Sequence, residues 1–451
     1  MIRGEDGARS AQSREIVRLA APAFLALVAE PLFLLADSAI IGHLGTAQLA
    51  GLGVASATLI TAANIFVFLA YGTTSIVARQ LGAGSQRGAL EAGIDGTWLA
   101  VGLGAVTSVV VALAAEPLCR VFGASDDALG YAATYLRISA LGIPAMLVAL
   151  AATGVLRGLQ DTRTPLVASV AGFSSNVVLN LVFVYGFGWG IAGSAWGTVI
   201  AQTAMATGLV VVMVSHARRA GATLHAHPGR VLRAGLTGIP LLVRTLALRA
   251  ILLVTTWVAA GLGDVPLASH QVAATVWSFM AFALDALAIA AQALTGRALG
   301  AGDVAGARAA TTTMIRWGVW GGAVLGLFVL AIHSLLPALF TTDPAVRSAL
   351  SAALVVVSLG QPLAGYVFVV DGVLIGAGDG RWLAGAMAAT LVLYLPLAMW
   401  VHARSDDLLT HGAPSAVAVL WVVFTAFMVI RACFFWWRIR GDSWAVTGAA
   451  R

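Results

Sequence analysis

The chain has 451 residues, of which 60% are hydrophobic and only 10% are charged, and its formal net charge is +6. Charged residues make up about a quarter of an ordinary soluble chain, so this composition excludes a soluble globular protein. All 26 basic residues are arginines, and their distribution is that of a membrane protein, so the positive charge does not indicate a nucleic-acid partner.

Twelve apolar segments follow one another along the chain, and each is long enough to cross a hydrocarbon core of about 30 Å as a helix. The predicted fold class is therefore an all-α polytopic membrane protein with twelve transmembrane helices. The first segment is too long for a cleavable signal peptide and is expected to be an uncleaved span. The predicted spans are residues 16–42, 47–77, 94–116, 129–155, 165–187, 191–215, 236–261, 266–296, 312–339, 347–375, 382–403 and 413–437.

The arginines predict which side of the membrane each loop faces. With the N-terminus in the cytoplasm, the termini and the loops on that side carry 18 arginines, whereas the opposite loops carry Arg120, Arg347 and Arg404. This asymmetry follows the positive-inside rule and predicts a multi-pass protein of the plasma (cytoplasmic) membrane, the cell inner membrane, with both termini in the cytoplasm.

The chain contains an internal repeat. A constant shift in residue number, called here the repeat offset, relates the two copies and takes residue 78 to residue 296. ARQLGAGSQRGAL (78–90) matches GRALGAGDVAGAR (296–308) at seven of thirteen positions, and the same offset aligns Pro22 with Pro240. Each copy holds six spans, so both copies insert with the same orientation. We expect two six-helix lobes related by a pseudo-two-fold axis along the membrane normal.

The repeat divides the chain into an N-terminal lobe (1–215), a polar cytoplasmic linker (216–235) and a C-terminal lobe (236–451). The linker histidines are read as solvated residues and not as a metal site. The two cysteines have no metal-ligand spacing, and no phosphate-binding loop is present, so no metal or cofactor is expected. A two-lobed repeat protein with many spans is typical of a secondary transporter, and no cluster of nucleophile and base suggests an enzyme.

Four of the twenty acidic residues are placed inside predicted spans: Glu30, Asp37, Asp285 and Asp371. Charge inside a membrane is costly and by default marks an ion or substrate pathway. A carboxyl group removed from water takes up a proton more readily, which makes it a usable proton switch. Pro31 follows Glu30 and removes a backbone hydrogen bond, so we expect a hinge in the first span.

Asparagine is scarce, and two of the three asparagines, Asn176 and Asn180, stand one helical turn apart in the fifth span. Their amides can serve an acid that changes protonation state, or they can join neighbouring helices by structural hydrogen bonds. The scarcity favours the first interpretation.

Several motifs resemble one known family. They are EPLFLLADSAIIGHLG from residue 30, YLRI followed by Pro144, NVVLN in span five, GSAWGTVIAQ in span six, LGAG after span two, DALAIAAQALTGR (285–297) and DGVLIGAGD (371–379). Together they resemble the multidrug and toxic compound extrusion (MATE) transporters of the DinF-like branch, over nearly the whole chain.

The resemblance implies that Asp37 is the proton site of the N-terminal lobe, with Asn176, Asn180 and Thr198 as its hydrogen-bonding network and Tyr135 as a neighbour. The position of Asn180 is an aspartate in some members of the family, so this chain lacks one acid there. Glu30 either replaces that acid or is a snorkelling or interlobe-contact residue, and both readings stay open.

The acids of the second half have competing explanations. Asp285 either pairs with Arg249 in span seven, which would be structural, or takes part in cation binding. Asp371 is a candidate for the substrate cavity or its gate, and Arg244 is expected to be a structural partner. Asp285 and Asp371 therefore form a possible C-lobe substrate or cation site.

The function implied by the resemblance is multidrug efflux of amphipathic organic cations by antiport with H⁺, and such export causes drug resistance. Protonation of Asp37 would bend the first span at Pro31. Na⁺ stays an alternative coupling ion, because the side chains around Asp37 offer oxygen ligands. We expect a monomer in the lipid bilayer. The rival function is a flippase of the same superfamily that moves a lipid-linked precursor.

Overall fold

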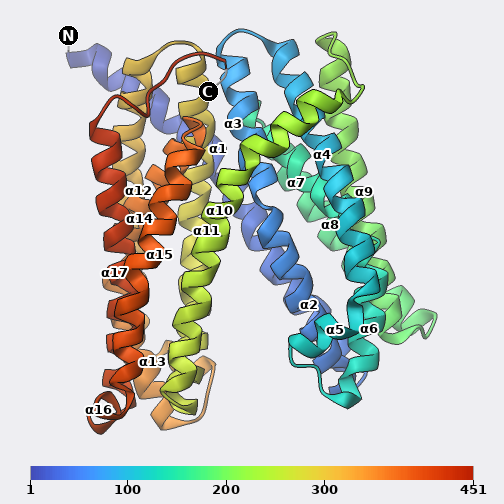
Figure 1. Cartoon of the computed structure of the whole chain (residues 1–451), viewed down its shortest axis with the longest axis vertical. Coiled ribbons are helices and arrows are strands. Elements are labelled where there is room, and N and C mark those ends of the chain that lie inside the picture. The colour runs from blue at the N-terminus through green and yellow to red at the C-terminus, as the bar shows by residue number, and fades with distance from the viewer. Residues whose placement is uncertain (1, 450–451) are drawn as a thin grey trace. The chain divides into compact units, whose positions relative to one another are not determined.

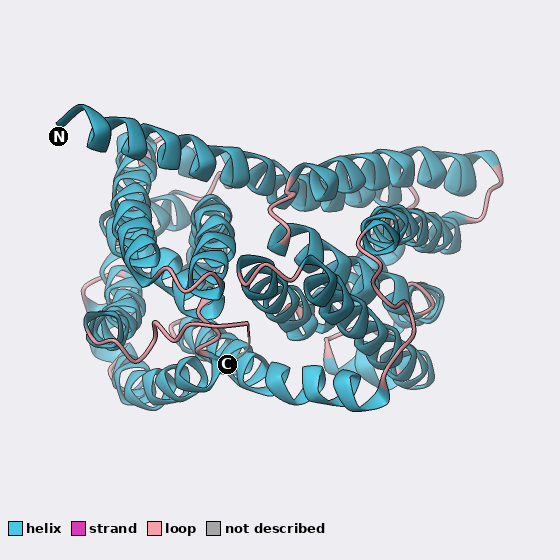
Figure 2. Ribbon diagram, turned by 90° about the horizontal axis from the view of Figure 1, so that it is seen from above, coloured by secondary structure: helices cyan, strands magenta, loops and turns pink. Residues whose placement is uncertain are grey.

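The computed structural model describes residues 2–449, except for the side chains of residues 2–13, Glu30 and Leu35. Helices joined by short loops make up the described chain, and no strand occurs within residues 2–449 (Figure 2). The first half comprises α1 (Ile2–Gly42), α2 (Thr46–Phe66), α3 (Phe68–Gly82), α4 (Gln86–Leu113), α5 (Ala115–Val121), α6 (Asp126–Ala140), α7 (Ile143–Gly158), α8 (Arg163–Leu181), the π-helix η1 (Val182–Gly186) and α9 (Gly190–Arg219) (Figure 1). The second half comprises α10 (Pro228–Gly261), α11 (Asp264–Gly300), α12 (Val304–Ile332), the 3₁₀-helix η2 (Leu336–Leu339), α13 (Pro344–Leu359), α14 (Gln361–Gly376), α15 (Gly380–Ala403), α16 (Ser405–Thr410) and α17 (Ala413–Arg440).

In the described chain, ten helical segments are long and apolar enough to cross a membrane, and two further pairs of helices each make one span that is bent. The bent pairs are α6 with α7 and α13 with α14, and each pair is bent by 52°. The number of spans is therefore up to twelve, and the predicted all-α membrane fold is confirmed. Each predicted span falls on one of these helices or bent pairs.

The two bends have the same cause in both repeats. Pro144 and Pro362, which the repeat offset aligns, stand at the start of the second helix of each pair, where a proline has no N–H to bond to the carbonyl four residues earlier in the first helix. Glycines on the neighbouring helices leave room for the bend. A Cβ on Gly104 would lie 2.6 Å from the Cα of Pro144, and one on Gly322 would lie 2.2 Å from the carbonyl oxygen of Gln361.

Helix packing is repeated as well. Gly154 of α7 lies against Ala70 of α3, where an added Cβ would come within 2.5 Å of the Ala70 carbonyl oxygen. Gly372 of α14 lies against Ala288 of α11 in the same way, at 2.3 Å from the carbonyl oxygen. The repeat offset takes each residue of the first pair to its counterpart in the second. Small residues allow such close backbone contact between membrane helices, and here they preserve it in both repeats.

The chain forms two compact units. Residues 21–239 make up most of one, called here the N-terminal unit, and residues 240–447 make up most of the other, the C-terminal unit. The C-terminal unit also includes the start of α1, up to Ala20. The polar stretch expected as a linker (216–235) is only partly a loop, because α9 continues to Arg219 and α10 begins at Pro228.

Candidate functional site

Asp37 lies in α1 within the N-terminal unit and is 2% exposed. One carboxylate oxygen, Oδ1, accepts hydrogen bonds from Asn180 Nδ2 at 2.8 Å and from Ser194 Oγ at 2.7 Å. The other oxygen, Oδ2, accepts a long hydrogen bond of 3.4 Å from the Tyr135 hydroxyl. Helices α6, α8 and α9 thus each supply one neutral donor to this acid.

A chain of hydrogen bonds continues from Asp37 across α8 to α9. Asn180 Nδ2 also donates to Asn176 Oδ1 at 2.9 Å, and Asn176 Nδ2 donates to Thr198 Oγ1 at 3.0 Å. The two asparagines face the same way because they are four residues apart on a helix. All three side chains are buried. The structure therefore brings Asp37 together with the four residues predicted to surround it. They are Tyr135, Asn176, Asn180 and Thr198.

Glycines on α9 allow this network to form. A Cβ on Gly197 would lie 2.1 Å from Asn180 Oδ1, so only glycine lets α8 approach α9 so closely at this point. Four residues earlier, Gly193 lies against the backbone of Phe183 in η1. A π-helical turn inside a helix is uncommon and often marks a functional site. Tyr185 of η1 donates to the carbonyl oxygen of Ile40 in α1 at 2.6 Å.

Asp37 has no charged counterpart among the described side chains. The ion pairs found between them join other acids, and none includes Asp37. The described side chains that contact it are all hydroxyl and amide donors. A carboxylate in this environment keeps its charge at a cost that protonation would remove.

One cavity adjoins the network, and another is lined by residues of α2, α6 and the segment that leads into α9. The smaller, of ≈20 Å³, is lined by Asn176 and Thr198 and by the stacked rings of Phe33 and Phe173, whose centroids are 5.1 Å apart. The larger, of ≈340 Å³, is lined without any charged residue by Leu44, Gln48, Tyr131, Thr134 and residues 188–192. Its volume lies in the range of small-molecule sites.

Asp371 of α14 lies in a different environment in the C-terminal unit. Its Oδ1 accepts from Arg244 Nε at 3.1 Å and pairs with Arg431 Nη2 at 2.9 Å, and its Oδ2 pairs with Arg244 Nη2. All three side chains are buried. Two guanidinium groups therefore surround the carboxylate that the sequence proposed for a cation site, and Arg244, for which the sequence named no partner, is one of the two.

The remaining predicted residues lie on α1, α10 and α11. Asp285 is a partly buried residue of α11, and Arg249 is an exposed residue of α10, so the pair between them stays a prediction. Pro31 lies inside the continuous helix α1, as does Pro22. The side chain of Glu30 lies outside the described residues.

Sequence reasoning missed three residues. The expectation of four acids within spans was wrong, because Asp95 lies in the span formed by α4 and is 3% exposed. Ser194 stands four residues before Thr198 in the GSAWGTVIAQ motif, so helical spacing could have placed it beside the network. Arg431 was visible as an arginine inside the last span, but no pattern in the sequence assigns it to Asp371.

A twelve-span protein with an internal repeat and a buried, unpaired acid is a membrane transporter in class. The MatE family model matches the chain twice, over residues 22–182 and 240–400, and the two ranges are related by the repeat offset. The chain belongs to the MatE family, that is, the multidrug and toxic compound extrusion transporters, and is not an enzyme. The predicted resemblance is confirmed.

Named relatives support this assignment. The chain is 32% identical over 458 residues to Protein DETOXIFICATION 44, chloroplastic, of Arabidopsis thaliana, which covers 97% of this chain and 84% of the relative. It is 30% identical over 305 residues to DNA damage-inducible protein F of Escherichia coli, covering 65% of each. It is 26% identical to Multidrug resistance protein PmpM of Pseudomonas aeruginosa, over 77% of this chain and 75% of the relative.

Solved structures share the fold. A MATE crystal structure in the bent conformation superposes with a TM-score of 0.86 at 22% identity and covers 97% of both chains. A MATE structure in the straight conformation gives a TM-score of 0.83 at 21% identity, covering 96% of this chain and 97% of that one. These structures support the fold of twelve spans in two lobes.

Proposed function

We propose that this transporter exports amphipathic organic cations in exchange for protons, with Asp37 as the coupling group. The observation that carries the proposal is the environment of Asp37, which is 2% exposed, has three neutral donors and has no ion pair among the described side chains. Intramembrane acids of this kind mark ion pathways. A group that can change its protonation state can shift a helix packing equilibrium when it titrates.

The donors around Asp37 favour a proton over a sodium ion as the coupling ion. Hard cations take oxygen ligands, but an amide nitrogen of Asn180 and a donating hydroxyl of Ser194 face Oδ1. The oxygen of Asn176 is already occupied by the Asn180 amide. A sodium ion would have to displace these donors, whereas a proton adds to the carboxylate directly.

The Asn180 amide is placed to respond to the protonation state of Asp37. Its Oδ1 is buried and finds no hydrogen-bond partner in the described chain, while its Nδ2 donates both to Asp37 and to Asn176. When Asp37 is protonated, it becomes a donor, and rotation of the Asn180 amide brings Oδ1 to accept from it. Asn176 Nδ2 then donates to Asn180, and the hydroxyl of Thr198 donates to Asn176 Oδ1. Protonation thus reverses the direction of donation along the chain of hydrogen bonds that runs from α1 to α9.

Bending of α1 at Pro31 is the proposed mechanical response. Pro31 stands six residues before Asp37 and leaves one backbone hydrogen bond unmade, so the helix is weakened there. Phe33, two residues later, stacks on Phe173 of α8 and lines the small cavity. A bend at Pro31 moves Phe33 against Phe173 and changes the volume of this cavity. Glu30 is kept as a second candidate for proton coupling.

The larger cavity is the proposed substrate passage of the N-terminal unit. Tyr131 and Trp189 line it, and their side chains are 38% and 51% exposed. Aromatic faces bind organic cations, and apolar walls suit the rest of an amphipathic molecule. In the proposed orientation, with both termini in the cytoplasm of a plasma-membrane protein, this cavity faces outward. We expect the transporter to act as a monomer.

For the C-terminal unit we propose a structural role for Asp371, because Arg244 and Arg431 occupy both of its oxygens. Removing one member of such a buried group leaves uncompensated charge, so its members hold α10, α14 and α17 together. Asp285 stays a candidate for cation binding.

The second candidate function is movement of a lipid-linked, anionic precursor. The observation that favours it is the burial of two guanidinium groups, Arg244 and Arg431, which are 6% and 4% exposed. Guanidinium groups bind phosphate with paired hydrogen bonds. Asp371 already engages both arginines, which makes cation export the better supported function.

The test is efflux of a fluorescent cation, ethidium, from proteoliposomes with an imposed pH gradient, with and without Na⁺. We expect efflux that requires the proton gradient and is lost in Asp37→Asn. Asp264→Asn is the matched control, because it removes an exposed acid at the start of α11. Efflux that persists in Asp37→Asn would refute the role of Asp37. Absence of cation efflux in every protein, together with movement of a fluorescent lipid phosphate, would favour the flippase.

A further inference from the structure

Helix α10 is shared between the two units. Residues 228–239 belong with the N-terminal unit, and the C-terminal unit begins at Pro240, inside the same helix. A proline has no backbone N–H and cannot bond to the carbonyl four residues earlier, so α10 lacks one of its hydrogen bonds at this point. The position of the proline and the change of unit coincide.

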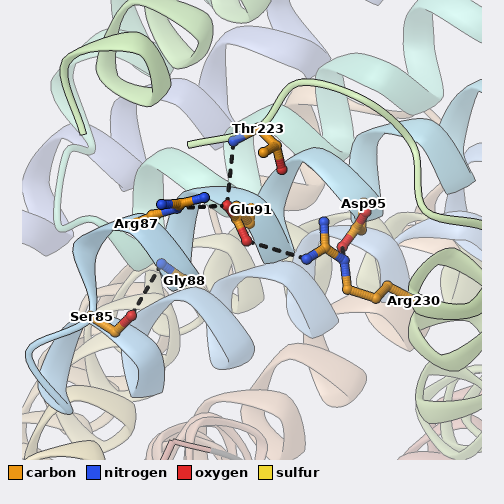
Figure 3. Close-up of polar contacts among 7 residues, drawn as sticks. All are labelled: Ser85, Arg87, Gly88, Glu91, Asp95, Thr223 and Arg230. Carbon is orange, nitrogen blue, oxygen red and sulfur yellow. Dashed lines mark hydrogen bonds and ion pairs between the residues drawn. The ribbon is translucent and has the colours of Figure 1, made fainter. Parts of the chain in front are cut away.

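The start of α10 is held by an anchor cluster of three residues, Arg230, Glu91 and Asp95. Arg230 Nε lies 2.8 Å from Asp95 Oδ2, and Arg230 Nη1 lies 3.2 Å from Glu91 Oε2 (Figure 3). The two acids stand four residues apart on one face of α4. Asp95 is only 3% exposed, whereas the Arg230 side chain is 40% exposed, so the ion pair is partly shielded from solvent.

Further contacts fix the segment before Arg230 to the same face of α4. Glu91 Oε1 accepts from the backbone N–H of Thr223 at 3.3 Å and from Arg87 Nε at 2.9 Å (Figure 3). One turn beyond the two acids, Trp98 Nε1 donates to the carbonyl oxygen of Leu224 at 3.1 Å. The polar stretch between the two halves of the chain is therefore bound to the N-terminal unit.

The packing of α10 changes at the proline. Just before it, Gly238 lies against Phe68 of α3, where an added Cβ would meet the ring at 2.7 Å. Just after it, Arg244 pairs with Asp371, and Thr255 shares a 2.6 Å hydrogen bond with Tyr394. The helix is thus attached to the N-terminal unit on one side of Pro240 and to the C-terminal unit on the other.

Helix α1 shows the reciprocal arrangement. Leu19 and Ala20 pack against Ala290 of α11 and belong with the C-terminal unit, whereas the residues from Ala21 onward belong with the N-terminal unit. Pro22 stands at this change of unit. The repeat offset aligns Pro22 with Pro240, so the same device occurs at the same place in both repeats.

We propose that Arg230, Glu91 and Asp95 are positioning residues that keep the first turns of α10 attached to the N-terminal unit throughout the transport cycle, so that α10 bends at Pro240. The proposal rests on the proposed transport function, because a transport cycle requires the two units to rearrange. Bending at a proline breaks no existing hydrogen bond, so Pro240 is the position in α10 where rearrangement costs least.

The first experiment measures transport in two proline variants. We expect Pro240→Ala to lower the rate of ethidium efflux about tenfold while the dissociation constant for ethidium changes less than twofold. Pro396→Ala is the matched control, because Pro396 lies inside α15, a helix that stays within the C-terminal unit. A wild-type rate in folded Pro240→Ala overturns the hinge. Loss of efflux in the wild type as well would instead mean that the proposed function has failed.

The second experiment needs no substrate. Spin labels at Leu232→Cys and Leu253→Cys, in a background with Cys119→Ala and Cys433→Ser, report the shape of α10 on either side of Pro240. Both leucines are exposed, and an unbent helix separates them by roughly 32 Å. We expect a second, shorter distance to appear when the pH is changed in nanodiscs, and Pro240→Ala to abolish it. One unchanged distance at every pH overturns the proposal.

The anchor cluster is tested by fixing it. A short bis-methanethiosulfonate crosslinker joins Glu91→Cys to Arg230→Cys in the background with Cys119→Ala and Cys433→Ser. It replaces the ion pair with a covalent link that a reductant can cleave. We expect efflux to stay within twofold of the wild type, and Arg230→Ala without the crosslinker to transport about fivefold more slowly. Efflux that stops on crosslinking and returns on release with a reductant would show that the cluster opens during the cycle, contrary to the proposal.

Discussion

Thr255 occupies in the second repeat the position that Asp37 occupies in the first, and it cannot carry a charge. Its partner, Tyr394, is likewise the counterpart of Asn176, and the two hydroxyl groups are 2.6 Å apart. Both residues are almost fully buried. The C-terminal unit thus holds a neutral version of the network around Asp37, and of these two versions only the N-terminal one contains an acid.

This asymmetry predicts the behaviour of Thr255→Val. The change keeps the shape of the side chain and removes the hydroxyl, which leaves the Tyr394 hydroxyl without that partner and costs about 1–3 kcal/mol of stability. We expect a lower thermal unfolding temperature in detergent, with ethidium efflux and its dependence on the pH gradient unchanged. Loss of proton coupling in folded Thr255→Val would show that the C-terminal network also takes part.

Ser194 is predicted to set the pH range of transport. Its hydroxyl donates to Asp37 Oδ1 at 2.7 Å and so favours the charged form of the acid. Ser194→Ala removes this donor, and a hydrogen bond to a charged group contributes about 1.5–3 kcal/mol. The protonated form then persists to higher pH, and we expect the pH optimum of efflux to move upward by about one unit.

The control for Ser194→Ala is Ser215→Ala, because within the described chain Ser215 donates only to the carbonyl oxygen of Val212 in its own helix. We expect Ser215→Ala to keep the wild-type pH profile. An unchanged profile in both variants would remove Ser194 from the proposed coupling network.

Asn180 is predicted to need a side chain that can donate and accept. Asn180→Leu deprives Asp37 of one of its three donors and Asn176 of the amide that donates to its Oδ1, so we expect proton-driven efflux to fall at least tenfold. Asn180→Asp places a second carboxyl group 2.8 Å from the first, and two such groups share one proton. We therefore expect Asn180→Asp to retain efflux, which transport assays at several pH values measure. Full activity in Asn180→Leu would contradict the proposed reversal of the hydrogen-bond chain.

Much of the fold could be predicted because it follows from regular patterns. Apolar length located the spans, and the constant repeat offset located the two halves, since both depend on local composition. The bends at Pro144 and Pro362 were present in the sequence as prolines, but their angle of 52° depends on packing against glycines of other helices. Sequence alone does not specify such contacts between distant segments.

The candidate site was predictable where its residues were rare or matched motifs of the MATE family. Asn176 and Asn180 stood out by scarcity, and the structure places them beside Asp37. Asp95 was missed although the predicted span 94–116 contains it, because an acid so close to the start of a span resembles an ordinary loop residue. Its partner, Arg230, lies far from it along the chain, and only folding brings the two together.

Asp371 is predicted to stabilise the C-terminal unit without serving as a cation site. In Asp371→Asn, the guanidinium groups of Arg244 and Arg431 lose their shared carboxylate, and breaking a buried charge group in this way costs about 3–5 kcal/mol. We expect a marked fall in the unfolding temperature, followed by tryptophan fluorescence, and an unchanged dissociation constant for ethidium in the protein that remains folded. Arg438→Gln is the control. Arg438, at the end of α17 and away from Asp371, is the ion-pair partner of another buried aspartate, Asp379. If Asp371 binds the substrate cation, ethidium binding weakens more than tenfold in Asp371→Asn while Arg438→Gln binds normally.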